Sequence, residues 1–506
     1  MAGWLLLLIA FTVFALWRWL TNKEVRDGPK LPPSPYGKIP LLGHLWRLNA
    51  TKPFATIDAW SQQLGDVFSI YFGTDRVIVL SRNRVLKEAF LQQAANFSGR
   101  PDLFVHRSCW GVGHVISEGP VNVETRKFLL TVMREGGVSS GLNAHIQTRV
   151  DAEVGIMLNS IDEKLANGEC DLDIEDTTFF VVGNVLTSMV LGRTYPHNSD
   201  EFRQNSAWLA KTTELMHRSS ALTFLPWLRF APPSGFGYWE MKRQAKAVNQ
   251  MMTKDIENRI RTQEYKDVNK IDLTSAFLRK IDDVTQNKGR KQEVESKCYT
   301  TTKLARIMTE MFFAGIQTEC NTFGWAFLYL IEHPDVQEKC RQQIWDEMGR
   351  DRRPQWEDRL KIPYLEAMVH EVQRCANIAP FAIFHKTFKD TVLDGYLVPA
   401  NSMIMMNLWS TLRDPEYFPC PEEFRPERFL DEFGAVKERL ESLLPYGIGS
   451  RICMGESLAR IELFVIIGAL LQRYRFYKIP GVQYSLEQNM ELTIHAAKYK
   501  LRVEKL

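Results

Sequence analysis

The sequence has little excess charge and no arrangement of cysteines that marks a metal cluster or a disulfide framework. Its 63 basic and 60 acidic residues leave a formal net charge of +3, so no overall field favours nucleic acid or an acidic polymer as a partner. The eight cysteines lack the close spacings of a zinc site or a small disulfide scaffold. Most are expected to be reduced thiols packed in the core. No internal repeat or low-complexity tract is evident.

Charge is also absent from the segment between Met1 and Trp17. This run is long enough to cross a bilayer if the Arg18 side chain snorkels to the interface. A cleaved signal peptide is the alternative, but a basic n-region and a small-residue cleavage site are both missing. Basic residues follow the run and none precedes it, so the positive-inside rule predicts that the bulk of the chain faces the cytosol. We therefore predict a transmembrane anchor at residues 1–20.

The chain beyond this anchor predicts a hinge and then one large domain. Residues 21–45 are basic and rich in proline, which fixes φ and lacks an N–H donor, so a helix is excluded there. The segments Val67–Phe72 and Arg76–Leu80 predict a β-hairpin, because β-branched and aromatic residues flank a turn. Most of the remainder has helical periodicity. The predicted fold is mainly α with small β-sheets, in a single catalytic domain over residues 46–506.

One predicted helix is long enough to cross the whole domain. Apolar residues recur on one helical face over residues 301–331, and His333–Pro334 predicts where the helix ends. By contrast, residues 262–297 are rich in Lys, Asp, Gln and Asn with little periodicity. They predict solvated surface rather than a domain boundary.

The strongest chemical signal is a glycine-rich loop around Cys453. Glycines at three positions remove side chains around this cysteine, so that a flat ligand can approach the backbone: Gly447, Gly449 and Gly455. An apolar helical pattern begins just after the loop, which places Cys453 at a helix N-terminus, where the dipole favours a thiolate. Arg451 is positioned to hold a carboxylate of the same ligand.

This loop resembles the haem-binding loop of the cytochromes P450, in which Phe or Tyr, Gly, Arg, Cys and Gly stand at fixed spacing. Tyr446 stands here where phenylalanine is usual. The resemblance implies a haem-thiolate monooxygenase with haem b as cofactor and Cys453 as the axial ligand of the iron. The resemblance covers essentially the whole chain after the anchor. The sequence of Pro363–Arg374 is most similar to the animal microsomal enzymes that oxidise drugs, fatty acids and steroid-type hormones.

A second part of the resemblance is structural. Glu371 and Arg374 lie three residues apart on one predicted helix and can pair. By itself such spacing usually marks a solvated ion pair. In the family this pair is joined by an arginine from a downstream loop, and the resemblance assigns that role to Arg428.

The third part lies within the long predicted helix. Gly315 is expected to leave a gap in the helix wall, and Thr318 shares its face and can present a hydroxyl there. The segment resembles the family's oxygen-activation groove. The acid that usually precedes the threonine is replaced by Gln317, while a carboxylate follows at Glu319. The resemblance therefore implies that Thr318 positions the delivered protons, with Glu319 or Gln317 in support.

Haem propionates need donors, and the resemblance implies three of them. Arg126 lies in a segment similar to the helix that binds a propionate through a Trp and an Arg, but Asn122 stands where the Trp is expected. Arg451 and His385 are the other two donors.

Several apolar positions are expected to form the substrate pocket, although core packing is the alternative for each. Those predicted to line it are Phe104, Phe312, Gly315, Phe381, Ile383 and Leu492. The apolar loop from Phe224 to Phe230 suits a pocket rim that dips into lipid. The expected substrate is therefore a lipophilic small molecule such as a steroid, fatty acid, terpenoid hormone or xenobiotic, hydroxylated or epoxidised.

No flavin or nicotinamide fingerprint is evident, so electrons must come from a partner. By resemblance the partner is the NADPH–cytochrome P450 reductase of the endoplasmic reticulum membrane, with cytochrome b5 as a second partner and no nucleic acid. Candidate docking charges are Lys127, Arg134, Lys437 and Arg439. Two alternatives stay open: a haem-thiolate isomerase or dehydratase that needs no reductase, and a haem sensor or carrier without catalysis.

Deleting residues 1–28 should release much of the protein from membranes, because the long uncharged run lies there. The measurement is the fraction of protein that stays in the membrane pellet after alkaline carbonate extraction. Weak residual association is expected from the Phe224–Phe230 loop. Full integration of the truncated protein in carbonate would contradict the anchor.

Overall fold

The computed structural model of the chain describes Thr12 and residues 30–133, 143–196, 199–286 and 292–506. Apart from Thr12, the predicted anchor lies outside the described residues, as do hinge residues 21–29 and Arg134. The chain divides into two compact units. Of the described residues, the sheet unit contains those from 30 to 101, 381–410 and 448–450, and the helical unit contains those between 102 and 380, 411–447 and 451–506.

The sheet unit is built around a four-stranded sheet in the order β1-β2-β7-β4. The predicted hairpin is confirmed, because β1 and β2 pair antiparallel with Val67 opposite Leu80. β7 then adds parallel to β2, and β4 adds antiparallel to β7. The bounds are β1 (Val67–Phe72), β2 (Asp75–Ser81), β4 (His385–Lys386), β5 (Thr391–Leu393), β6 (Tyr396–Val398), β7 (Met403–Asn407), α2 (Pro53–Leu64), α3 (Asn83–Lys87) and α14 (Leu408–Thr411).

Apolar burial on both faces explains why this sheet tolerates near-continuous hydrophobic strands. Residues Val77–Ser81 of β2 are all buried. Helix α2 begins with Pro53 at its first turn, where a missing N–H costs nothing. It buries Phe54, Ile57 and Trp60 on one side and contacts β1.

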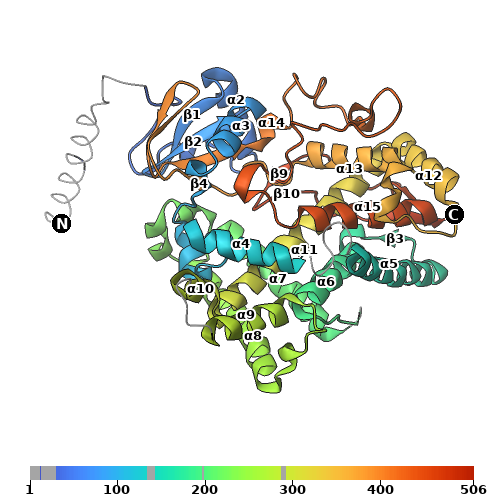
Figure 1. The fold of residues 1–506 in the computed structure, drawn as a ribbon. Helices are drawn as coiled ribbons and strands as arrows, with labels where there is room; N and C mark the ends of the chain where they lie inside the picture. The colour runs from blue at the N-terminus through green and yellow to red at the C-terminus, as the bar shows by residue number, and fades with distance from the viewer. Residues whose placement is uncertain (1–11, 13–29, 134–142, 197–198, 287–291) are drawn as a thin grey trace. The chain divides into compact units, whose positions relative to one another are not determined.

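The helical unit carries most of the helices, as Figure 1 shows in colours from cyan to red. They are α4 (Gly119–Met133), α5 (Asn143–Ala166), α6 (Ile174–Leu191), α7 (Asp200–Arg218), α8 (Tyr238–Thr262), α9 (Leu273–Gln286), α10 (Gln292–Cys298), α11 (Thr301–Glu332), α12 (Pro334–Met348), α13 (Pro363–Ala376) and α15 (Glu456–Arg473). In one of its sheets, β11 (Leu501–Lys505) lies between β3 (Asp171–Leu172) and β8 (Tyr474–Tyr477) and pairs with both. In another, β9 (Asn489–Met490) pairs with β10 (Ile494–His495). The predicted class, mainly α with small sheets, is confirmed.

Helix α11 forms the centre of the helical unit and matches the long helix predicted over 301–331. The Thr300 hydroxyl accepts a hydrogen bond from the Lys303 N–H at 3.1 Å and caps the first turn. The helix ends at Glu332, just before His333 and Pro334, as predicted. Every residue from Glu319 to Ile331 is buried, which is typical of a helix surrounded by others in a core.

Helix α6 packs against α11 and α5. Among the described residues it is the one helix long and apolar enough to cross a membrane, but most of it is buried inside the helical unit. The Asp173 side chain caps its N-terminus by accepting from the Glu175 and Asp176 N–H groups at 2.9 and 3.2 Å. We therefore assign α6 to the core.

The polar stretch at 262–297 contains more structure than its composition predicts. It holds helices α9 and α10 within its described part. Leu273, Phe277 and Leu278 of α9 are buried, while polar residues cover the rest of the helix. The expectation of solvated surface alone was wrong, because a narrow apolar stripe on one face is enough to fix a helix on a core.

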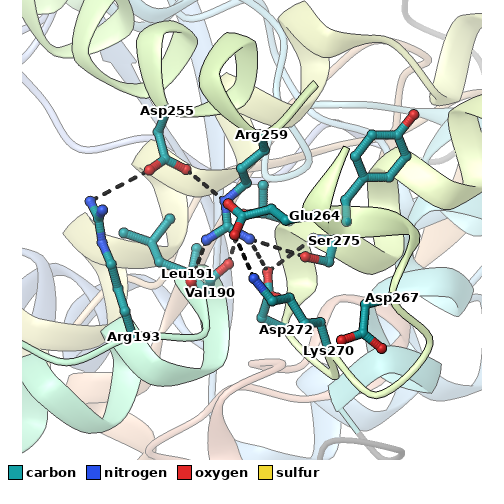
Figure 2. A network of polar contacts seen from close by, with 12 residues as sticks. Val190, Leu191, Arg193, Asp255, Arg259, Glu264, Asp267, Lys270, Asp272 and Ser275 are labelled. Carbon is teal, nitrogen blue, oxygen red and sulfur yellow. Dashed lines mark hydrogen bonds and ion pairs between the residues drawn. The ribbon is translucent and has the colours of Figure 1, made fainter. Parts of the chain in front are cut away.

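A buried charge network joins three of these helices (Figure 2). Arg259 of α8 binds Asp255 on its own helix at 3.1 Å and Asp272, just before α9, at 3.0 Å. Its guanidinium also donates to the Ser275 hydroxyl at 3.0 Å and to the carbonyl of Leu191 at the end of α6. One arginine thus satisfies polar groups at the ends of two other helices.

Replacing Arg259 with Met should destabilise the fold by about 3–5 kcal/mol, because the buried Asp272 carboxylate would lose its cation. The control is Lys270→Met, which removes an exposed pair with Glu264 in the same network and should cost less than about 1 kcal/mol. Denaturant unfolding of the two variants measures the difference. Equal losses would mean that burial does not decide the strength of these ion pairs.

Candidate active site

The loop before α15 presents the Cys453 sulfur beside small residues. Cys453 is solvent-exposed, and its backbone N–H donates to the Tyr446 carbonyl at 3.0 Å. A Cβ atom added at Gly455 would lie 3.8 Å from the sulfur, and one added at Gly447 would meet no atom within 4 Å. A flat ligand can therefore reach the sulfur without meeting a side chain at either position.

Within the sheet unit, Gly449 meets a different constraint. Its φ of +86° lies in the left-handed region, and an added Cβ would stand 2.4 Å from the Phe90 carbonyl oxygen. Glycine is required here for backbone conformation and for close packing.

The sequence predicts that the helix dipole favours a thiolate at Cys453, but the structure raises the pKa of this thiol. The residue is exposed, yet the neighbouring protein atoms take hydration from its sulfur, and this desolvation raises the pKa of the Cys453 thiol above its ordinary value. A hydrogen bond from the Gly455 backbone and the charge of Arg126 lower the pKa only in part, while Glu456 and Glu319 raise it. The start of α15 alone therefore does not make the free thiol a thiolate; a bound metal ion would favour that ionisation.

Two arginines are held together next to this cysteine. Arg126 of α4 donates to the Ile452 carbonyl at 2.5 Å, and Arg451 donates to the Ser117 carbonyl at 2.7 Å. Burial and the neighbouring Arg126 charge lower the pKa of Arg451 to about 10. Two clustered guanidiniums fit an anionic ligand, which would relieve their repulsion. The pair suits the carboxylates of a haem.

Asn122 supports this arrangement from α4. Its side-chain amide donates to the His114 carbonyl and to the Ser117 hydroxyl, both at 3.2 Å. Because the Ser117 carbonyl in turn accepts from Arg451, Asn122 steadies the segment that holds Arg451. The sequence shows that Asn122 replaces the usual Trp, but it does not reveal that Asn122 supports the segment that binds Arg451.

Three predicted site residues belong to the sheet unit. The Nδ1 atom of His385 lies 2.9 Å from the Phe97 carbonyl oxygen, and its ring stands edge-on to Phe90 with centroids 4.6 Å apart. Phe381 is buried and Ile383 is exposed. Their roles toward haem and substrate stay predictions.

The predicted oxygen-activation segment lies on α11. The Thr318 hydroxyl donates to the Ala314 carbonyl at 2.6 Å, and Thr318 and Gln317 are both partly exposed. Glu319, by contrast, is buried, and burial raises the pKa of its carboxyl. An added Cβ at Gly315 would stand 2.8 Å from Leu186 of α6. Leu186 therefore occupies the gap expected at Gly315, which lets α6 pack closely on α11.

The predicted pocket residues of the helical unit lie in different settings. Phe312 is buried on α11, whereas Leu492 is half-buried between β9 and β10. Phe104 stacks on Tyr238 with ring centroids 5.6 Å apart, and both belong to an apolar cluster with Leu222 and other neighbours. This cluster joins the segment before α4 to the segment between α7 and α8.

The Glu310 carboxylate, which the sequence analysis did not predict as a site residue, fixes the loop that contains His114 and Val115. Glu310 of α11 accepts from the backbone N–H groups of His114 and Val115 at 2.7 and 3.1 Å. A Cβ atom at Gly113 would stand 2.2 Å from the same carboxylate, so glycine is needed for this approach. The glycines at 111 and 113 were the only signal in the sequence.

The structure brings the three residues of the predicted charge cluster together. Glu371 is fully buried and pairs with Arg374 at 2.7 Å and with Arg428 at 2.9 Å. Arg428 also donates to carbonyls in its own loop, for example that of Pro419 at 2.9 Å. The cluster fixes this loop on α13 and is paired throughout, as a structural role requires.

Comparison with known proteins gives one consistent result. A sequence model of the family described as Cytochrome P450 matches residues 32–503. The chain is 30% identical to "Cytochrome P450 1A2" of Homo sapiens over 507 residues, covering 97% of this chain and 95% of that protein. It is also 30% identical to "Cytochrome P450 2A5" of Mus musculus over 458 residues, covering 90% and 89%. "Cytochrome P450 1A1" of Rattus norvegicus is 29% identical over 503 residues, covering 97% and 94%.

Replacing Cys453 with Ser should abolish thiolate ligation while leaving the fold intact, because the side chain is small and lies in a loop. The measurement is the Soret band of the reduced carbon-monoxide complex. Cys420→Ser is the control, since it alters the other exposed cysteine and should leave the red-shifted band unchanged. Retention of that band in Cys453→Ser would refute the ligand assignment.

Proposed function

The chain belongs to the cytochrome P450 family of monooxygenases, and on that premise we propose that it inserts one oxygen atom from O2 into a lipophilic small molecule. The observation that carries this proposal is the accessible Cys453 sulfur in its glycine-rich loop, with Arg126 and Arg451 held beside it. Hydroxylation and epoxidation are the expected outcomes.

Haem is the cofactor of this family, and we assign haem b to this chain. Cys453 would hold its iron, and the Arg126 and Arg451 guanidiniums would bind propionates, with His385 as a third donor. When bound, the thiolate-ligated haem supplies the oxygen chemistry, because the sulfur pushes electron density toward the iron and favours O–O cleavage.

The α11 residues are assigned the handling of protons. The Thr318 hydroxyl already donates to the Ala314 carbonyl, so its oxygen can accept a hydrogen bond from a water molecule. Gln317 offers an amide rather than an acid, so it can orient water but cannot itself lose a proton near neutral pH. Thr318 is therefore the main organiser of proton delivery in this proposal.

Electrons are expected from a partner protein. We propose NADPH–cytochrome P450 reductase as the donor and cytochrome b5 as a second partner. Lys127, Lys437 and Arg439 are exposed and stay candidate docking charges. The endoplasmic reticulum membrane is the proposed location, with residues 1–20 as the anchor and the catalytic domain in the cytosol.

The apolar surface between α7 and α8 supports a substrate that enters from lipid. Trp227 and Phe230 are 53% and 69% exposed, although large aromatic side chains are normally covered. Arg229 lies between two rings, 5.0 Å from the Phe104 centroid and 4.5 Å from that of Phe230. Aromatic and cationic side chains together suit the headgroup region of a bilayer.

A screen of steroids, fatty acids, terpenoid hormones and xenobiotics, read as a shift of the Soret band, would identify the substrate class. NADPH consumption with purified reductase then separates the three functions considered from the sequence. A monooxygenase consumes NADPH as it forms an oxygenated product. An isomerase or dehydratase turns over without NADPH, and a sensor or carrier forms no product.

Replacing Thr318 with Ala should lower the product formed per NADPH severalfold, because oxygen that is reduced but wrongly protonated escapes as peroxide. Product, NADPH and peroxide are measured in the same reaction. Thr309→Ala is the matched control: it removes a similar hydroxyl, which donates to the Ala305 carbonyl, from the opposite side of α11. Full coupling in Thr318→Ala would show that protons arrive by another route.

A further inference from the structure

Two carboxyl groups lie buried between the central helices of the helical unit. Glu319 of α11 is 5% exposed and Glu462 of α15 is 3% exposed, and the two helices contact each other. One oxygen of each carboxyl, Oε1, has no hydrogen-bond partner in the described part of the chain. The charge of Glu462 acts on Glu319, so the two groups share one environment. The family resemblance assigns Glu319 a supporting role in proton delivery, and it assigns Glu462 no role.

A second polar pair lies beside them. The Gln373 side-chain amide of α13 donates to the Tyr446 hydroxyl at 2.6 Å, and both residues come from segments next to the Cys453 loop. Burial and the charge of Glu319 raise the pKa of Tyr446. Tyr446 stands where phenylalanine is usual, so this chain has placed a hydroxyl on which the Glu319 carboxyl acts.

Within the described ranges of the chain, no cation acts on either carboxyl. Burial and Glu462 account for the raised pKa of Glu319, and burial alone raises the pKa of Glu462 to about 8. Arg460 acts on Tyr446, and Arg126 acts on Cys453, but neither contributes to the two carboxyls. Cys320, next to Glu319, is subject to both carboxyls and to Glu175 and Asp176 of α6, which are acidic as well.

Two buried carboxylates without a cation cannot both be ionised, since each lacks hydration and repels the other. The stable arrangement holds at least one proton, and it titrates as a unit rather than as two separate acids. Glu319 is also one of the groups that act on Cys453. The charge of the pair therefore acts on the proposed iron ligand.

We propose that Glu319 and Glu462 hold a shared proton, and that loss or uptake of this proton sets the charge felt by Cys453 and thereby the reduction potential of an iron bound there. This inference rests on the proposed function. When the iron gains one electron, which the flavin of the reductase gives up, a proton from solvent forms an O–H bond on a carboxylate of the pair. The added negative charge is thereby balanced.

The first test is the iron reduction potential of the full-length holoenzyme between about pH 6 and pH 9, the range around a raised carboxyl pKa. The wild-type potential should fall as pH rises, because a growing negative charge disfavours the added electron. The slope should not exceed about 59 mV per pH unit, which corresponds to a tenfold change for a one-electron couple. The double variant Glu319→Gln/Glu462→Gln should show a flat potential near the wild-type value at low pH.

Glu175→Gln is the matched control. The pKa of its carboxyl is also raised by burial, to about 7, but Glu175 is not among the groups that act most strongly on Cys453, whereas Glu319 is. This variant should keep the wild-type slope. The same slope in the double variant would overturn the inference. A wild-type protein without the red-shifted carbon-monoxide band would instead overturn the proposed function, which separates the two failures.

A second test measures how the stability of the protein changes with pH and does not depend on the reduction potential of the iron. A carboxyl whose pKa is raised in the folded state binds more protons there than in the unfolded chain, so stability falls as pH rises from about 4.5 to about 8. Glu462→Gln should flatten this loss in denaturant unfolding, since glutamine cannot ionise. Glu462→Asp should keep the loss. If Glu462→Gln loses stability with pH as steeply as the wild type, the shared proton does not exist.

Discussion

The structure depends on bringing one cysteine sulfur to an accessible position beside tightly packed helices. Glycines meet this constraint in two ways: they leave space beside the sulfur, and they allow close packing of the backbone. Gly455 keeps a side chain away from the Cys453 sulfur, while Gly449 lets the backbone pass against Phe90. Burial and nearby charges then act on the thiol: burial, Glu456 and Glu319 raise its pKa, and Arg126 lowers it. The cysteine therefore lies in a balance of opposing charges rather than in a simple helix dipole.

The buried charged residues discussed above are of two kinds: those paired with an opposite charge and those without such a partner. Glu371, Arg374 and Arg428 are paired within hydrogen-bonding distance, as are Arg259 and its partners. Such networks are satisfied and serve to hold loops and helix ends. Glu319 and Glu462 have no cation, and each retains an oxygen without a hydrogen bond in the described residues. An unsatisfied buried pair is costly, which is why we assign it a role in function.

Local sequence patterns predicted those parts of the fold that are set by local physics. The β1–β2 hairpin, the extent of α11 and its end before Pro334 follow from alternation, helical period and proline chemistry. The Cys453 loop was found because fixed spacing of residue types is visible in one sequence. Helix α9 was missed because its apolar stripe is narrow among many polar residues. The tertiary partners of Gly315, Glu310 and Glu319 lie far away in the chain, and no local pattern reveals them.

Labelling of O2 with ¹⁸O measures whether the chain transfers an oxygen atom from O2 to its substrate. A substrate found by Soret shift would be turned over with reductase and NADPH under ¹⁸O₂, and the product would be analysed by mass spectrometry. The account predicts one labelled oxygen atom in each product molecule, with none derived from water. A product that carries no label, or one that takes its oxygen from water, would contradict it.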